Sequence, residues 1–560
     1  MIFLRVCVPF LLISTAFAQQ LSPSDRAAAD MAKKQIRPEA IRAHMRFLSD
    51  NMLTGRAPGT PGYDIAARYV ASELEGMRLR PAGDEGTWYQ QVPLRNAVVD
   101  EPRSSVEFIR NGQVQQLTNV TDYVFSGDVL RKEISVEASV VFVGFGVTAP
   151  DQQYDDYAGA DVKDKVVVYV YGAPARFPST ERAYYSDGVI KTKNAIAHGA
   201  IGILRFLSPE DQKRYPWDWL VPQIQAGNMH WLDNKGTPHN AFAEIRGGAF
   251  LSQRGAERLF TAAPHSLEQA LTTARSGQPQ AFRLPVSVRI HRVSKPTDLR
   301  SSNIIAMLPG SDPALRDQYV VYTAHLDHLG ICPPVNGDNV CHGAVDNASG
   351  TSSLLEIARA YASLPHAPRR SVLFVFVTGE EMGLLGSDYF AYFPTVPRKS
   401  IVANVNIDGA PGLYYAMKDI VPLGAEHSSM GDNVELAARQ MGYEISPDPM
   451  PEEVAFIRSD QYSFVLQGIP AVDITDGVKA FDPKVDGLAV IKKWLITRYH
   501  TPLDNMDQPL DYDSAARASG LNFLVGYELA QQDQPPAWNS GDFFGTTFGP
   551  KHSESRLAGK

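Results

Sequence analysis

A chain of 560 residues with 44% hydrophobic and 21% charged residues is typical of a globular protein, which excludes a disordered or repeat architecture. It is too long for one ordinary hydrophobic core, so we expect two domains or one domain with a large insertion. The formal net charge of −9 is spread without basic clusters, which argues against nucleic acid or an anionic membrane as a partner.

The amino terminus has the pattern of a secretory signal peptide, residues 1–18. Arg5 precedes an apolar stretch that ends at Phe17, and Ala16-Phe17-Ala18 forms a small-x-small cleavage site. The stretch is shorter than the ~20 residues that a membrane-spanning helix needs, so an uncleaved anchor is the weaker interpretation. We therefore expect a periplasmic or secreted protein with no membrane anchor after signal cleavage.

The next two regions differ in their predicted secondary structure. Residues 36–80 predict two helices around a Gly/Pro-rich loop, because apolar side chains recur at helical spacing: Ile65, Ala66, Tyr69, Val70 and Leu74. From about residue 100 to 290, short strand-like runs such as "ASVVFVGFGV" and "KVVVYVYGAP" alternate with many turns. This change indicates a mainly-β region that follows the first helices.

After residue 300, strands alternate with helices. The predicted strands are 303–308, 319–324, 371–378, 401–407 and 471–475, with helical segments such as "SSLLEIARAYASL" between them. Near-continuous apolar strands of this kind predict an α/β fold in which helices cover both faces of a mostly parallel sheet. Ligands bind such sheets beyond the carboxyl ends of the strands.

Possible metal ligands follow three of these strands directly: His325, the adjacent pair Glu380 and Glu381, and Asp408. Asp346 opens a turn before a helix, and His500 lies in a late loop. Each residue alone is more often a cap, a turn former or a surface group, so the prediction rests on their convergence at one sheet edge. A mixed set of imidazoles and carboxylates suits zinc and can also hold cobalt or manganese.

Two cysteines, Cys332 and Cys341, remain after signal cleavage. In an oxidising compartment, a pair on either side of a Pro- and Gly-containing loop predicts a disulfide. A zinc-binding pair is the weaker alternative, because the spacing is not C-x-x-C and no second cysteine pair exists. Two free thiols would be expected in a cytoplasmic protein.

Six motifs occur in order: "AHLDH", "GAVDNASG", "TGEEMGLLGS", "NIDG", "SDQYSF" followed by "GIPAV", and "YHTPLDN". Together they resemble the di-zinc metallopeptidases that include bacterial leucyl aminopeptidases and glutamate carboxypeptidase, peptidase family M28. "LTGRAPGTPG" is similar to that family's amino-terminal segment. "YDDYAGADVKDKVVV" and "KTKNAIAHGAIG" are similar to the protease-associated domain inserted in one branch. The similarity extends over about residues 36 to 530.

The resemblance implies a domain layout and a ligand set. The zinc peptidase domain would comprise residues 36–130 and 293–533, and the protease-associated insert would comprise residues 131–292. Residues 534–560 would form a loosely ordered tail, with three phenylalanines as candidates for docking: Phe543, Phe544 and Phe548. Asp346 would bridge two zinc ions. The remaining ligands would be His325 and Asp408 on one ion, and Glu381 and His500 on the other.

The resemblance also implies roles beside the metals. Glu380 would be the general base that takes a proton from water and passes it to the departing amine. Asp327 would orient the imidazole of His325, and Tyr499 would donate a hydrogen bond to the oxyanion. A cis peptide bond is expected between Asp346 and Asn347.

The predicted function is an exported aminopeptidase acting on peptides. Carboxypeptidase relatives hold the substrate carboxylate with an Arg just ahead of the "KTKNA"-like segment, and this chain has none there. Arg182 and Arg458 keep a dipeptidase or carboxypeptidase as an alternative, and a glutaminyl cyclase or a non-catalytic binding protein fits less well. Val345 and Gln461 replace the Asp and His of many relatives, but neither position is an implied ligand.

Overall fold

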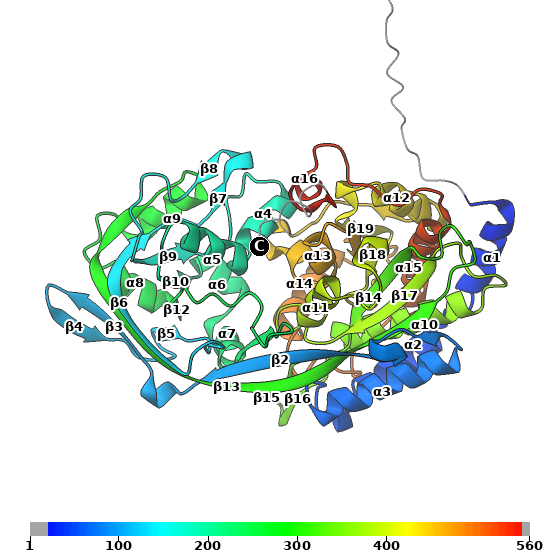
Figure 1. Ribbon diagram of the computed structural model, residues 1–560, viewed down its shortest axis with the longest axis horizontal. Coiled ribbons are helices and arrows are strands. Elements are labelled where there is room, and N and C mark those ends of the chain that lie inside the picture. The colour runs from blue at the N-terminus through cyan, green and yellow to red at the C-terminus, as the bar shows by residue number, and fades with distance from the viewer. Residues whose placement is uncertain (1–20, 551–560) are drawn as a thin grey trace, which may run out of the picture.

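The computed structural model describes residues 21–550, so the predicted signal peptide lies outside the described residues (Figure 1). Two β-sheets are joined by β13 (Phe282–Leu308), a long strand that runs through both. Its first half pairs with β6 (Glu133–Phe142), and its second half pairs with β2 (Tyr89–Val99) and β17 (Ser371–Val377). Within residues 21–550, no helix combines the length and hydropathy required to cross a bilayer.

The larger sheet has a parallel centre. Its strands lie in the order β17, β14 (Tyr319–His325), β18 (Ile401–Asn406) and β21 (Ala471–Asp476). Antiparallel strands flank this centre, with β13 beside β17 and β19 (Asp419–Leu423) beside β21. The five strands predicted after residue 300 are confirmed, and the fold class is α/β, as expected.

Helices cover both faces of these parallel strands. On one face, Val320 and Tyr322 pack in a core with α2 (Pro38–Leu48), α3 (Pro61–Gly76), α10 (Gly350–Ala362) and α15 (Tyr512–Gln531). On the other face, Val321 packs in a second core that includes α11 (Leu385–Tyr392) and α13 (Gln461–Val465). Because successive side chains point to opposite buried faces, the strands are apolar throughout.

The smaller sheet has the strand order β4 (Gln113–Gln116), β3 (Ser105–Arg110), β13, β6, β9 (Val166–Val170), β10 (Gly202–Phe206), β12 (Gly247–Leu251) and β5 (Tyr123–Val124). We refer to residues 131–292 as the inserted segment. Strands β3, β4 and β5 precede residue 131 but belong to the same sheet. The inserted segment therefore shares its sheet and its core with residues 105–124.

Residues 534–550, expected to lie in a loosely ordered tail, instead contain the helix α16 (Phe543–Phe548). Phe544 is fully buried, with its ring 4.7 Å from that of His427 and 5.1 Å from that of Phe456. Phe543 lies 5.2 Å from the ring of Tyr184 in α4 (Ser179–Ser186) of the inserted segment. The helix thus packs against the inserted segment and against the segments that carry His427 and Phe456, because its aromatic side chains contact partners that are distant in sequence.

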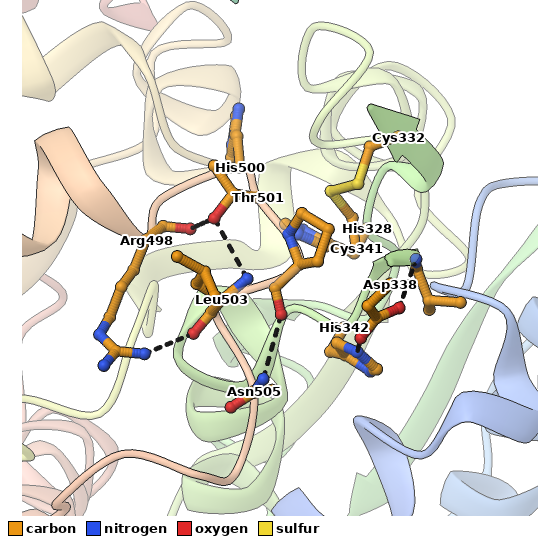
Figure 2. The surroundings of a disulfide bond; sticks show 12 residues. His328, Cys332, Asp338, Cys341, His342, Arg498, His500, Thr501, Leu503 and Asn505 are labelled. Atoms are coloured by element: carbon orange, nitrogen blue, oxygen red, sulfur yellow. Dashed lines mark hydrogen bonds and ion pairs between the residues drawn. A yellow bond between two sulfur atoms is a disulfide. The ribbon is translucent and has the colours of Figure 1, made fainter. Parts of the chain in front are cut away.

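A disulfide joins Cys332 and Cys341, as predicted (Figure 2). It links β15 (Gly330–Val335) to β16 (Asp338–Cys341), which form a two-stranded hairpin. At the same hairpin, Asp338 Oδ2 lies 2.8 Å from His342 Nε2. The alternatives of a zinc-binding pair or two free thiols therefore do not describe this structure.

Candidate active site

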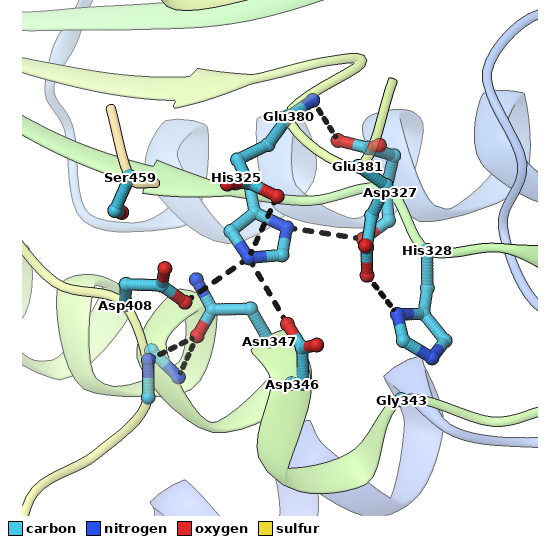
Figure 3. A network of polar contacts seen from close by, with 12 residues as sticks. His325, Asp327, His328, Gly343, Asp346, Asn347, Glu380, Glu381, Asp408 and Ser459 are labelled. Carbon is cyan, nitrogen blue, oxygen red and sulfur yellow. Dashed lines mark hydrogen bonds and ion pairs between the residues drawn. The ribbon is translucent and has the colours of Figure 1, made fainter. Parts of the chain in front are cut away.

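Three parallel strands bring polar side chains to one edge of the larger sheet. His325 is the last residue of β14, Asp408 follows β18 by two residues, and Glu380 and Glu381 follow β17 within four. Because β14 pairs in parallel with both β17 and β18, the carboxyl ends of all three strands lie together. Figure 3 shows these side chains converging on a common centre with Asp346.

Asp346 reaches this centre from a turn that precedes α10. The Asp346–Asn347 peptide bond is cis, which confirms the expectation. Asn347 Oδ1 accepts hydrogen bonds from the backbone N–H groups of Gly350 and Gly409, at 2.9 and 2.8 Å. The N–H of Asp346 donates to Asp504 Oδ2 at 3.0 Å. These bonds tie the turn to the loop that carries Asp408 and to the loop after His500.

The two oxygens of the Asp346 carboxylate face different imidazoles. Oδ1 lies 3.2 Å from His325 Nε2, and Oδ2 lies 3.2 Å from His500 Nε2. His325 Nε2 is also 3.2 Å from Asp408 Oδ1, and His500 Nε2 is 3.0 Å from Glu381 Oε2. All five predicted metal ligands are therefore brought together, in two groups that share Asp346; their roles stay predictions.

His328 also belongs to this centre, although the sequence interpretation gave it no role. Its Nδ1 contacts Glu381 Oε1, and potential ligand atoms of His328, Asp346 and Glu381 lie within 4.8 Å of one another. A second such group comprises His325, Glu380 and Asp408. His328 ends the "AHLDH" motif, so its imidazole type and its closeness to His325 were the available signal.

The donor set fits divalent cations. His328 Nε2 and both ring nitrogens of His500 are buried and have no hydrogen-bond partner, although His500 Nε2 lies close to two carboxylates. Buried polar atoms are almost always satisfied, so His500 Nε2, which lies close to two carboxylates without a hydrogen bond, indicates a site for a ligand between them. Imidazole nitrogens with carboxylate oxygens suit zinc, cobalt or manganese.

The neighbouring glutamates have opposite pKa shifts. Burial raises the pKa of Glu380 well above its usual value. The charge of His325 opposes this shift, whereas the charges of Asp408 and Glu381 add to it. Burial would also raise the pKa of Glu381, but His500 and His328 lower it to about 2. Two carboxyl groups with such different proton affinities can take different chemical roles, one as an ionised ligand and one as a proton carrier.

The position of Asp327 differs from the prediction. His325 Nδ1 lies 3.3 Å from the backbone carbonyl oxygen of Asp327, whereas the Asp327 carboxylate accepts a hydrogen bond from the backbone N–H of Glu380 at 3.2 Å. The chain turns after β14 so that the carbonyl, and not the carboxylate, faces the imidazole. The side chain of Asp327 therefore anchors the segment that carries Glu380.

A cavity of about 250 Å³ opens beside these groups, and Asp346, Glu380 and Asp408 form one of its walls. The lining also includes aromatic and apolar side chains: Tyr414, Met450, Ile491, Trp494, Leu495 and Tyr499. Arg458 is the only basic residue that lines it among the described residues, while Arg182 lines a different cavity. We call the predicted ligands together with Glu380 the charged side of the site, and the aromatic lining residues together with Arg458 its aromatic side.

Tyr499 contacts both a predicted ligand, His500, and Arg458. Its ring stacks on that of His500, with centroids 3.7 Å apart, and its hydroxyl oxygen accepts a hydrogen bond from Arg458 Nη2 at 3.1 Å. The phenol therefore lies beside a predicted metal ligand and borders the cavity. Its predicted role as a donor to the oxyanion is not tested by these contacts.

Comparison with known proteins gives similarities over much of the chain. A protein of Leptosphaeria maculans described as a probable zinc metalloprotease is 34% identical over 375 residues, which cover 60% of this chain and 80% of that protein. Aminopeptidase NAALADL1 of Rattus norvegicus is 25% identical over 300 residues, 43% of this chain. The chain spans only 38% of the length of that aminopeptidase.

Similarity to solved structures concerns the fold. The aminopeptidase from Aneurinibacillus sp. strain AM-1 superposes with a TM-score of 0.53 at 18% identity, covering 90% of this chain and 97% of that one. Residues 303–524, which include β14, β17, β18 and all the converging side chains, match the model of peptidase family M28. With the relative of 34% identity, this match shows that the chain belongs to peptidase family M28.

Proposed function

We propose that the protein is an exported aminopeptidase that uses two zinc ions to hydrolyse amino-terminal residues from peptides. The observation that carries the proposal is the carboxylate of Asp346, whose two oxygens each lie 3.2 Å from a different imidazole. A single carboxylate between two nitrogen donors, each with a further acid beside it, offers two adjacent cation sites. The relative from Leptosphaeria maculans, described as a zinc metalloprotease, supports zinc as the metal.

The proposed ligands form two sets that share Asp346: His325 and Asp408 in one, Glu381 and His500 in the other. His328, in contact with Glu381, would orient that carboxylate. Zinc held by these residues would lower the pKa of water and polarise the carbonyl of the scissile peptide bond. Cobalt or manganese would fit the same donors.

Glu380 is the proposed proton carrier. It is part of the group of potential ligands around His325, yet it lies further from His325 Nε2, at 3.8 Å, than Asp346 and Asp408 do. A carboxylate in this position accepts the proton of the attacking water and passes it to the departing amine. Burial raises its pKa, which brings its proton affinity closer to that required at neutral pH.

Charge in the cavity supports an aminopeptidase. Beyond the predicted ligands and Glu380, four acids line the cavity against one arginine: Asp448, Glu453, Asp473, whose pKa burial raises well above its usual value, and Asp476. A wall rich in carboxyl groups favours a substrate end that carries an ammonium over one that carries a carboxylate. Arg458 is the specific observation that keeps a carboxypeptidase or dipeptidase as the second candidate, because a guanidinium is the usual partner of a substrate carboxylate.

Export and the nature of the inserted segment belong to the same proposal. The predicted signal peptide and the disulfide between Cys332 and Cys341 support a periplasmic or secreted location. The mixed β-sheet of the inserted segment, with the motifs that resemble a protease-associated domain, supports its assignment as such a domain.

A direct experiment tests the function. The purified mature protein is expected to contain about two zinc ions per chain by metal analysis, and to cleave aminoacyl-nitroanilides but not amino-terminally blocked peptides. A chelator should abolish the activity and added zinc should restore it. Cleavage of the blocked peptides from their carboxyl ends would instead support the second candidate, and a protein that binds no divalent ion would contradict both.

A further inference from the structure

The inserted segment contacts residues of the candidate active site through two aromatic side chains. Trp219 lies in α7 (Trp217–Gln225), and its ring stacks on that of His500, with centroids 5.9 Å apart at 21°. Tyr215 lies between α6 (Pro209–Arg214) and α7, and its ring stacks on that of Trp219 at 6.1 Å. Trp219 thus packs directly on the site, although more than half of the chain separates it from His500.

The hydroxyl of Tyr215 belongs to a hydrogen-bonded chain that ends at Tyr499. Tyr215 Oη donates to Glu453 Oε2 at 2.7 Å and accepts from Arg458 Nη1 at 3.4 Å. Arg458 Nη2 donates to Tyr499 Oη at 3.1 Å. Glu453 Oε2 also lies 3.8 Å from Arg458 Nη1, so the guanidinium is held on one side by an acid and a phenol.

The direction of these bonds fixes where the Tyr499 hydroxyl can donate. A guanidinium has only donors, so in the contact with Arg458 the Tyr499 oxygen must be the acceptor. The single hydroxyl hydrogen of Tyr499 therefore stays available, and no group among residues 21–550 accepts it in a hydrogen bond. Tyr499 lines the cavity beside Asp346 and Glu380, where a substrate carbonyl would lie.

We propose that Tyr215 is a positioning residue for catalysis. It holds Arg458 together with Glu453, and Arg458 in turn orients the Tyr499 hydroxyl so that its hydrogen points to the oxygen of the scissile carbonyl. The inserted segment is then part of the catalytic apparatus and not a passive spacer. This inference rests on the proposed peptidase function, and it assigns Arg458 to Tyr499 rather than to a substrate carboxylate.

A double-mutant cycle on the zinc-loaded full chain tests the proposal. Tyr215→Phe keeps the ring and its stacking on Trp219 but removes the hydroxyl, and it should lower kcat about tenfold with KM within about twofold. In a Tyr499→Phe background, the same change should alter kcat less than about twofold, because the group that Tyr215 positions is gone. The control is Tyr185→Phe. It removes another hydroxyl of the inserted segment, which donates a hydrogen bond to the carboxylate of Asp151. The kcat of this variant should stay at the wild-type value.

A binding measurement gives an independent readout. An aminophosphonate, which resembles the tetrahedral transition state, should bind Tyr215→Phe more weakly by about the same factor as the loss in kcat/KM, measured by calorimetry. Zinc content and the thermal midpoint should equal those of Tyr185→Phe. Should Tyr215→Phe fail to fold, Glu453→Ala removes the acceptor of the Tyr215 hydroxyl and should show the same dependence on Tyr499.

The outcomes separate the two proposals. If the wild type hydrolyses peptides but Tyr215→Phe has wild-type kcat, or lowers kcat equally with and without Tyr499, the positioning role is overturned and the peptidase function stands. If the zinc-loaded wild type hydrolyses no peptide, both proposals are overturned. Loss of kcat only in the presence of Tyr499, with unchanged zinc content, supports both.

Discussion

The charged side and the aromatic side of the site are built by different means. On the charged side, His325, Glu380, Glu381 and Asp408 each lie at or within four residues of the end of a parallel strand, so the sheet register places them. On the aromatic side, the contact between Arg458 and Tyr215 joins residues 243 positions apart. One half of the site therefore follows from local strand positions, whereas the other half depends on how distant segments dock.

The largest effect is expected from the carboxylate shared by both ligand groups. Asp346→Ala should remove most bound zinc and reduce turnover to background, because it takes an oxygen from each group. Metal analysis of the dialysed protein checks this. Asp338→Asn is the matched control, since that aspartate pairs with a histidine of the hairpin outside the cavity. An Asp346→Ala protein with full zinc content would contradict the role of Asp346 as the shared ligand.

The next largest effect separates metal binding from proton transfer on the charged side. Glu380→Gln should lower kcat by about 10³-fold or more, because the amide cannot accept the proton of water. Its zinc content should stay near that of the wild type, since the other acids remain. Steady-state kinetics together with metal analysis provide the measurement. Turnover within tenfold of the wild type would refute the role of Glu380 as the base.

The pH dependence of zinc binding should depend on His500 of the charged side but not on Tyr499 of the aromatic side. Against the effect of burial, Glu381 and Asp346 raise the pKa of His500 to about 9. A ligating imidazole must be neutral, so zinc displaces this proton, and zinc affinity should rise as the pH is increased from about 6 toward 9. Calorimetry in buffers of different ionisation enthalpy measures the proton release. His500→Ala should reduce the release, whereas Tyr499→Phe on the aromatic side should leave it unchanged.

A smaller effect is expected from the aromatic contact of the inserted segment. Trp219→Ala removes the ring that stacks on His500, and it should lower kcat/KM roughly fivefold to tenfold through misplacement of that imidazole. Trp217→Ala is the control from the same helix, since its ring stacks on Phe250 instead. Equal kinetics for the two variants would mean that the inserted segment packs on the site without influencing it.

The smallest effect on turnover is expected from the disulfide, which belongs to neither side. Replacing Cys332 and Cys341 by Ser opens a loop with a sequence separation of nine residues. This should lower the free energy of unfolding by about 2 to 3 kcal/mol, measured by urea denaturation, with kcat within twofold of the wild type. A large loss of kcat in the folded variant would place the hairpin in the active site.

Much of the charged side could be predicted because its signals are local. An apolar run that ends in His325, or in Glu380 and Glu381, marks both the strand and the edge at which ligands gather. Side-chain direction was harder to predict. The carboxylate of Asp327 turns to the backbone of Glu380 and not to His325, and His328 meets Glu381, because both depend on how the chain bends after the strand.

The inserted segment and the carboxyl-terminal region show the limit of sequence reasoning. The strand-like runs after residue 100 were visible, but the pairing of β3, β4 and β5 with strands of the inserted segment was not, since pairing joins distant residues. The packing of Phe544 against His427 and Phe456 likewise depends on partners far from it in the chain. An apolar pattern indicates that a side chain will be buried, but not against what.

The sequence by itself determined the α/β class, the parallel strands and the residue types that gather at their carboxyl ends. Strand periodicity depends on near neighbours, and parallel pairing brings strand ends to one edge whatever the loops do. Only the tertiary structure decided that Asp346 lies between two imidazoles, and that Tyr215 is hydrogen-bonded to Arg458. Those contacts join separate segments, so they exist only once both sheets and the long strand between them have packed.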